Sequence, residues 1–122
     1  PMMRQAGGGA IINFGSVGWM MASAGYPVYA ASKAATHGLT RGLARDLGKD
    51  RIRVNTLVPG WVMTDKQLAM WVDETAKEQI RQNQCMPGQL LPEHIADMAL
   101  FLASDAAAMC TAQNFIVDGG WV

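Results

Sequence analysis

Apolar and polar residues follow one another along this chain in a pattern that predicts strands separated by helices. Three short runs rich in apolar and β-branched residues cover positions 10–14, 52–58 and 114–117. Runs of this length and composition are typical of strands that are buried on both faces of a parallel sheet. Because longer helical segments separate the runs, we expect parallel strand pairing with right-handed crossovers.

The longest helix is predicted over about residues 28–47, where alanines and glycines share the helix with three leucines. Small residues in the middle of a helix permit close packing against a second helix or a sheet. Each central glycine costs about 1 kcal/mol relative to alanine, so tertiary packing must compensate. Gly48 is expected to end this helix.

Two further helices are predicted in the second half of the chain. Apolar residues recur at helical spacing between Thr64 and Arg81, with charged residues around them, and indicate one helix. Another helix begins near Pro92, since proline suits the first turn. Between the first strand and the first helix, residues 15–27 form a loop. The apolar side chains of that loop are compatible both with ligand binding and with hydrophobic cover.

Composition narrows the class of protein. Half of the 122 residues are hydrophobic, and ten basic residues cancel ten acidic ones. The balance gives no electrostatic reason to expect nucleic acid or an anionic membrane as a partner. No apolar run approaches the roughly 20 residues of a membrane span, and no signal-peptide pattern opens the chain. Cys85 and Cys110 lie far apart without metal-ligand spacing, so we expect no metal and two packed, reduced thiols in a cytoplasmic protein.

The candidate chemistry rests on Ser16, Tyr29 and Lys33. Positions i and i+4 of a helix share one face, so the Lys33 ammonium is expected near the Tyr29 phenol. A nearby cation favours the phenolate and turns tyrosine into a usable general acid and base. Ser16 follows the first strand, where its hydroxyl would hold a substrate oxygen beside Tyr29. Taken alone, the Tyr-x-x-x-Lys spacing is a weak signal, because on most helices it is a half-buried ring beside a solvated lysine.

Several stretches around these residues resemble the short-chain dehydrogenase/reductase family. They are residues 9–16, 29–33, 51–55, 59–64 and 115–120. The resemblance implies an α/β fold, a Rossmann-like doubly wound parallel sheet. Residues 1–122 would form the C-terminal part of one oxidoreductase domain, with about three strands and three helices.

The family's N-terminal dinucleotide-binding half is expected to be lacking. A phosphate-binding glycine turn follows a strand and opens a helix, whereas Gly7-Gly8-Gly9 precedes a strand. Two explanations stand: the chain is a fragment, or a partner chain supplies the remainder.

The resemblance also implies site residues. Ser16, Tyr29 and Lys33 would be catalytic, and NAD or NADP would be the cofactor. The residues implied in cofactor binding are Tyr29, Lys33, Pro59, Gly60, Val62 and Thr64. Thr64 is equally suited to capping a helix, and the two roles are compatible. The family often has serine where this chain has Gly15, which leaves Ser16 in its place.

Within the family, the chain looks like bacterial aldose 1-dehydrogenases, which oxidise sugars to lactones. The residues implied in substrate binding are Ser16, Trp61, Gln67, Trp71 and Gln84. Indole faces stack on sugar C–H surfaces, and amides bond hydroxyl groups. Trp71 also fits the apolar stripe of its own predicted helix. His37 and His94 are expected on helix surfaces, and Asn13 is expected to be structural.

The function implied is oxidation of an alcohol or hemiacetal by hydride transfer to NAD or NADP, with a sugar as the small-molecule substrate. The alternative is a truncated, catalytically silent chain that acts as an oligomerisation or interaction module. An unpaired strand edge at residues 10–14 invites pairing with another chain. Together with the small-residue helix, this edge predicts a homo-oligomer.

Overall fold

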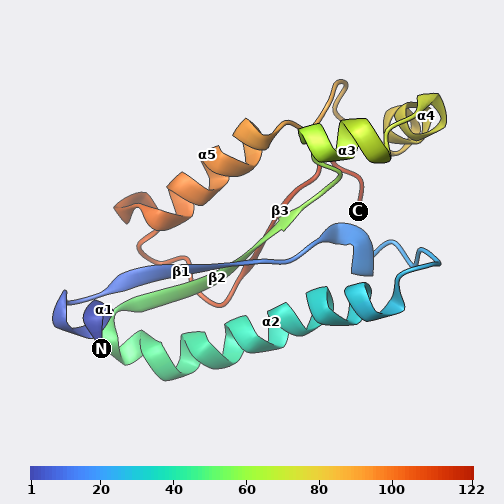
Figure 1. The fold of residues 1–122 in the computed structure, drawn as a ribbon. Helices are drawn as coiled ribbons and strands as arrows, with labels where there is room; N and C mark the ends of the chain where they lie inside the picture. Colours follow the sequence, from blue (N-terminus) through green and yellow to red (C-terminus); the bar gives the residue numbers. More distant parts are fainter.

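A three-stranded parallel sheet forms the centre of the computed structural model, which describes residues 1–122 (Figure 1). Its strands are β1 (Gly9–Phe14), β2 (Ile52–Pro59) and β3 (Asn114–Val117), in the order β1-β2-β3. β2 is therefore the central strand, and Phe14 lies opposite Leu57 at the carboxyl end of β1. The sheet confirms the α/β class and the three predicted strands.

Helices cover both faces of this sheet, as expected for a doubly wound fold. The α-helices are α1 (Met2–Gln5), α2 (Pro27–Leu47), α3 (Asp65–Met70), α4 (Glu74–Asn83) and α5 (Pro92–Ala103). Three 3₁₀ turns lie between helices and strands: η1 (Val17–Trp19), η2 (Gly48–Asp50) and η3 (Asp105–Ala107). Figure 1 shows α2 along one face of the sheet and α5 along the other.

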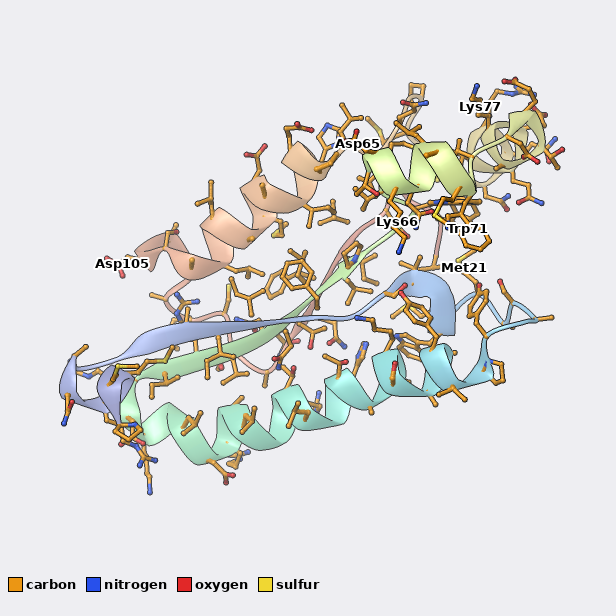
Figure 2. The ribbon with its side chains drawn as sticks, viewed as in Figure 1. Met21, Asp65, Lys66, Trp71, Lys77 and Asp105 are labelled. Atoms are coloured by element: carbon orange, nitrogen blue, oxygen red, sulfur yellow. The ribbon has the colours of Figure 1, made fainter.

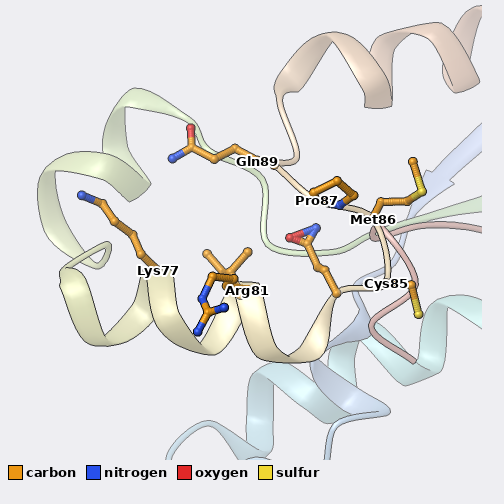
Figure 3. A pocket seen from close by; sticks show the side chains of 9 residues that line it. Lys77, Arg81, Cys85, Met86, Pro87 and Gln89 are labelled. Atoms are coloured by element: carbon orange, nitrogen blue, oxygen red, sulfur yellow. The ribbon is translucent and has the colours of Figure 1, made fainter.

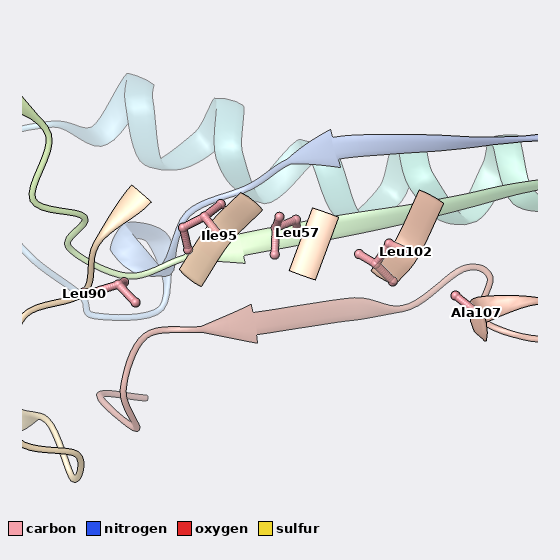
Figure 4. Packing of buried hydrophobic residues seen from close by; sticks show 5 residues of the cluster. All are labelled: Leu57, Leu90, Ile95, Leu102 and Ala107. Carbon is pink, nitrogen blue, oxygen red and sulfur yellow. The ribbon is translucent and has the colours of Figure 1, made fainter. Parts of the chain in front are cut away.

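Alternation along β2 divides the core between these two faces. Val54 packs with Ile52 and Ala44 on the α2 side. Leu57, three residues later, joins the cluster on the α5 side with Ile95 and Leu102 (Figure 4). Successive side chains of a strand point to opposite faces, so an odd separation puts Val54 and Leu57 on different faces. Both side chains are completely buried, as predicted for a strand covered on two sides.

The single helix predicted from Thr64 to Arg81 is wrong, because the chain forms two helices there. α3 ends at Met70, and Trp71 has a non-helical backbone with φ −134°. Asp73 then starts α4, and its carboxylate accepts a hydrogen bond of 2.8 Å from the Ala76 amide. Aspartate is a strong N-cap residue, and this cap begins a new helix inside an apolar pattern of helical spacing.

The end of α2 also differs in detail from the expectation. The helix stops at Leu47, yet Gly48 keeps a right-handed conformation with φ −59°. The left-handed residue is Arg51, with φ 57°, at the end of η2. The carbonyl of Arg51 accepts a hydrogen bond from the Gly9 amide at 3.2 Å. The turn thus brings the start of β2 beside the start of β1.

Candidate functional site

Ser16 lies just beyond the carboxyl end of β1. The Gly15 amide donates to the Leu57 carbonyl, and a Cβ atom at Gly15 would lie 3.1 Å from Thr56 Cγ2. Glycine therefore lets the chain leave β1 close against β2. Ser16 then caps η1, and its Oγ atom accepts a hydrogen bond of 3.1 Å from the Gly18 amide. In open α/β sheets, ligands bind outside the carboxyl ends of the strands, where this hydroxyl lies.

Tyr29, in the first turn of α2, meets Ser16 across Gly18. A Cβ atom at Gly18 would lie 3.3 Å from Ser16 Oγ and 3.5 Å from Tyr29 Cε1. Tyr29 is 46% exposed, and the Tyr26 ring packs edge-on against its ring with centroids 5.9 Å apart. Ser16 and Tyr29 therefore border one small, accessible space.

Lys33 completes this group one turn further along α2. Its Nζ atom lies 5.8 Å from the centroid of the Tyr29 ring and donates a hydrogen bond of 3.1 Å to the Phe14 carbonyl. The structure thus brings the three candidate catalytic residues to one end of the sheet. Their chemical roles stay predictions.

A chain of side-chain hydrogen bonds connects the elements that carry the site. Asn13 Nδ2 of β1 donates to Thr40 Oγ1 of α2 at 2.9 Å. The hydroxyl of Thr40 lies 2.7 Å from that of Thr56 of β2. Both threonines are fully buried, so these bonds satisfy groups that would otherwise be costly in the core. Asn13 lies here, in a structural network.

The candidate cofactor residues of the second loop follow β2 directly. The Gly60 amide donates to the Val117 carbonyl of β3 at 2.9 Å. Val62 pairs with Leu90 in an isolated parallel bridge. The exposed Thr64 caps α3 by accepting a hydrogen bond from the Gln67 amide at 3.3 Å. Because Pro59 ends a strand parallel to β1, this loop leaves the same edge of the sheet as Ser16.

The candidate substrate residues fall into separate places. Trp61 Nε1 donates a hydrogen bond of 2.9 Å to Gln67 Oε1, so these two lie together. Trp71 is 59% exposed at the end of α3, and in Figure 2 it projects toward the loop that carries Met21. Gln84 follows α4, where its amide rests against Gly119.

Gln84 also lines a shallow surface cavity beside α4. Its other lining residues include Lys77, Arg81 and Gln89 (Figure 3). Arg81 is paired with Glu78, and this ion pair raises the pKa of the Arg81 guanidinium while lowering the pKa of the Glu78 carboxyl. Apolar side chains, among them Ile80 and Met86, line the cavity beside these polar ones.

One expectation for a single residue is wrong, that of Cys85. His37 lies half-buried on α2, and its ring packs edge-on against Trp19 with centroids 4.8 Å apart. Burial lowers the pKa of His37 below its ordinary value of 6.5. Cys85 is exposed rather than packed, while Cys110 is half-buried and both are free thiols. His94 is exposed as expected, and its Nδ1 atom accepts a hydrogen bond of 3.0 Å from the Leu91 amide.

The Trp19–His37 contact is the feature of this region that the sequence interpretation missed. His37 follows Lys33 by four residues and Tyr29 by eight, which was the available signal for a shared helix face. No group of three or more histidine, cysteine, aspartate or glutamate side chains could hold a metal ion. None of the helices is both long enough and apolar enough to cross a membrane.

Relatives of known name match this chain closely. D-xylose 1-dehydrogenase of Caulobacter vibrioides is 45% identical over 121 residues, which covers 99% of this chain and 48% of that protein. The probable galactose dehydrogenase of Rhizobium meliloti is 40% identical over 120 residues, covering 98% and 47% of the two proteins. The chain spans about half the length of these curated relatives.

Solved structures share the fold over the same extent. 7α-hydroxysteroid dehydrogenase, complexed with NADH and 7-oxo glycochenodeoxycholic acid, matches with a TM-score of 0.91 at 35% identity, over 98% of this chain and 47% of that chain. Gluconate 5-dehydrogenase from Burkholderia cenocepacia, in complex with NADP and tartrate, matches with a TM-score of 0.89 at 31% identity, over 98% and 47%. Residues 1–122 also match the family described as Enoyl-(Acyl carrier protein) reductase. Because the family match covers residues 1–122 and the relatives cover 98% or more of the chain, the chain belongs to the short-chain dehydrogenase/reductase family.

Proposed function

We propose that this chain forms the C-terminal part of a single Rossmann-type domain in an NAD(P)-dependent dehydrogenase that oxidises an aldose to its lactone. The observation that carries the proposal is the meeting of Ser16 and Tyr29 around Gly18, with Lys33 one turn away. Relatives named as xylose and galactose dehydrogenases support the class of substrate.

In this proposal Tyr29 takes the proton of the substrate hydroxyl. Its ring is accessible and lies beside Ser16, whose hydroxyl would orient the same substrate oxygen. Lys33 would favour the phenolate of Tyr29 through its positive charge. Ser16 Oγ already accepts the Gly18 amide, so its hydroxyl proton is free to be donated toward the substrate oxygen.

NAD or NADP, when bound, would accept the hydride from the carbon that bears the reacting hydroxyl. The residues proposed to hold its nicotinamide end are Tyr29, Lys33, Pro59, Gly60, Val62 and Thr64. They fit such a group because a half-exposed cation and an exposed hydroxyl lie at one carboxyl edge of a parallel sheet. The matched structures are complexes with NADP and with NADH, which supports either cofactor.

The proposed sugar site uses Ser16, Trp61, Gln67, Trp71 and Gln84. The hydrogen bond from Trp61 to Gln67 fixes an indole beside an amide, and such a pair supplies both a stacking face and polar groups for hydroxyls. Trp71 adds an exposed indole that projects toward the loop carrying Met21, whereas Trp61 is half-buried. Gln84 would join them by turning its amide away from Gly119.

The protein is further proposed to be a cytoplasmic homo-oligomer. Both cysteines are free thiols, in keeping with a reducing compartment. Apolar side chains on the outer surface of α2, among them Val28 at 82% and Leu39 at 56% exposure, support an interface between copies. No nucleic-acid or membrane partner is proposed for a chain with zero formal net charge.

A chimeric enzyme tests this function directly. In this chimera, called the fused enzyme below, the chain replaces the matched stretch of D-xylose 1-dehydrogenase from Caulobacter vibrioides. We expect aldose-dependent reduction of NAD or NADP, followed by the absorbance of the reduced nicotinamide. A folded fused enzyme that binds cofactor but oxidises no aldose, steroid or other alcohol would instead support the silent interaction module.

A further inference from the structure

Trp19 and His37 form a ring pair with two unsatisfied nitrogen atoms. The rings cross at 80° with centroids 4.8 Å apart, and both Trp19 Nε1 and His37 Nε2 are buried without a hydrogen-bond partner. A buried polar atom without a partner carries a cost of about 1–3 kcal/mol. Such a cost at two touching residues points to a function for the contact beyond filling space.

The pair connects the two elements that carry the proposed catalytic residues. Trp19 ends η1, whose Gly18 amide donates to Ser16 Oγ and whose Gly18 backbone borders the Tyr29 ring. His37 lies on α2, four residues after Lys33 and eight after Tyr29. Residues at this spacing occupy neighbouring positions on one helix face, so the ring contact falls on the same side of α2 as the site.

η1 needs such a contact because its own backbone holds it weakly. It is a three-residue 3₁₀ turn, a geometry with poorer hydrogen bonds than an α-helix. The Met20 and Met21 amides both donate to one carbonyl, that of Val17. Beyond the turn, Ala22 has φ 51° and Gly25 has φ 101°, so the backbone leaves helical geometry. Val17, 3% exposed, anchors the start of η1, and Trp19 anchors its end.

We propose that Trp19 and His37 are positioning residues, which dock η1 onto α2 and thereby set the separation of the Ser16 and Tyr29 hydroxyls. The catalytic consequence rests on the proposed function, whereas the docking itself does not. His37 packs as a neutral ring, in agreement with the lowered pKa that burial gives it. An edge-on aromatic pair contributes about 0.5–1.5 kcal/mol beyond its buried area.

Hydrogen exchange of the Gly18 and Met20 amides tests the docking in the full chain without any substrate. His37→Ala removes one ring and is expected to speed exchange of both amides about threefold to tenfold, the range that loss of an aromatic pair implies. His37→Phe keeps a ring and should restore the parent rates. His94→Ala removes the other histidine and the cap on Leu91, so it controls for a comparable loss of stability elsewhere.

Kinetics of the fused enzyme test the catalytic consequence. His37→Ala should lower kcat for the aldose about threefold to tenfold with an unchanged KM for the cofactor, and His37→Phe should recover kcat. If His37→Ala does not fold, Trp19→Leu with Trp19→Phe as its rescue gives the same comparison. The proposal would be overturned if the folded variants that lack a ring exchanged the Gly18 and Met20 amides at the parent rates. It would also be overturned if His94→Ala sped this exchange or lowered kcat as much as His37→Ala. An inactive parent enzyme would refute the proposed function, while amide exchange would still decide the docking.

Discussion

The ammonium of Lys33 donates a hydrogen bond of 3.1 Å to the carbonyl oxygen of Phe14. Phe14 is the last residue of β1, so the end of the sheet holds the lysine in place while it faces the Tyr29 ring at 5.8 Å. The bond directs a positive charge to the edge where Ser16 also lies. Several consequences of this arrangement are open to measurement.

Tyr29→Phe in the fused enzyme should lower kcat about 10²- to 10⁴-fold, because only the proton-transfer group is removed. Cofactor affinity should stay within about threefold, since the ring remains. Tyr26→Phe is the matched control, because Tyr26 packs against Tyr29 and also loses only a hydroxyl. Stopped-flow turnover and cofactor titration measure the two quantities. Equal activity of the Tyr29→Phe variant and the parent would rule out the assigned role.

Gly60→Ala should destabilise the chain by about 1–3 kcal/mol, the range for overpacking in a closely packed site. A Cβ atom there would lie 2.6 Å from Asp118 Cβ and 2.7 Å from Asp118 Cα. Asp118 cannot retreat easily, because its carboxylate accepts hydrogen bonds from the Gly120 and Val122 amides.

Gly38→Ala provides the comparison for Gly60→Ala. No atom lies within 4 Å of a Cβ at Gly38, and alanine favours the helix by about 1 kcal/mol over glycine. The urea concentration at the midpoint of unfolding should therefore fall for Gly60→Ala and rise for Gly38→Ala. A shift of the same sign for both would contradict the steric argument at Gly60.

The substrate proposal predicts that the fused enzyme oxidises xylose, arabinose or galactose in preference to steroids or acyl thioesters. Gln67→Leu removes the acceptor of the Trp61 hydrogen bond and should lower kcat/KM for the preferred aldose about tenfold, the loss expected when a partly buried donor loses its partner. Gln82→Leu, on the exposed side of α4, should leave kcat/KM unchanged. The aldose assignment fails if every sugar in such a panel is inert.

The lowered pKa of His37 leads to a prediction for how the free energy of unfolding depends on pH. Its folded-state pKa is lowered from 6.5 by burial, so the unfolded chain binds a proton at higher pH than the folded chain does. The free energy of unfolding should therefore fall as the pH drops below about 6.5, until the folded-state pKa is passed. Urea titrations across this range should show the slope in the parent and a smaller slope in His37→Phe. Identical slopes would contradict burial as the cause.

The proposed homo-oligomer predicts a concentration-dependent mass in light scattering. Leu39→Glu places a charge on the exposed apolar surface of α2 and should shift the chain toward monomer. Lys66→Glu makes a larger charge change on the exposed face of α3 and should not. A parent chain that is monomeric at micromolar concentration would refute the proposed assembly.

The parts predictable from sequence are those set by local pattern. The run of apolar and β-branched residues at 52–58 predicts a strand buried on both faces, because burial on two faces favours such residues at successive positions. The spacing of Tyr29 and Lys33 predicts their proximity because helix geometry is fixed. The break between α3 and α4 was not predictable from the pattern, because apolar residues keep their helical spacing through Trp71. The helix is nevertheless interrupted, because Asp73 caps a new one.

Contacts between residues far apart in the sequence could not be predicted from the spacing of apolar and polar residues. Trp19 meets His37 only because a loop of irregular backbone returns to α2, and no periodicity encodes that return. Gln84 rests on Gly119 for the same reason, since the two residues are 35 positions apart.

The side chain of Thr40 fixes the register of α2 against the sheet. Its hydroxyl meets both Asn13 and Thr56, which lie on adjacent strands, so α2 can neither slide nor rotate without breaking a buried bond. A shift of one residue would turn the helix by about 100° and advance it by about 1.5 Å. Tyr29, three turns away on the same rigid rod, would then leave Gly18 and Ser16. The buried hydroxyl pair of Thr40 and Thr56 thus determines where Tyr29 lies relative to Ser16, although it is far from both.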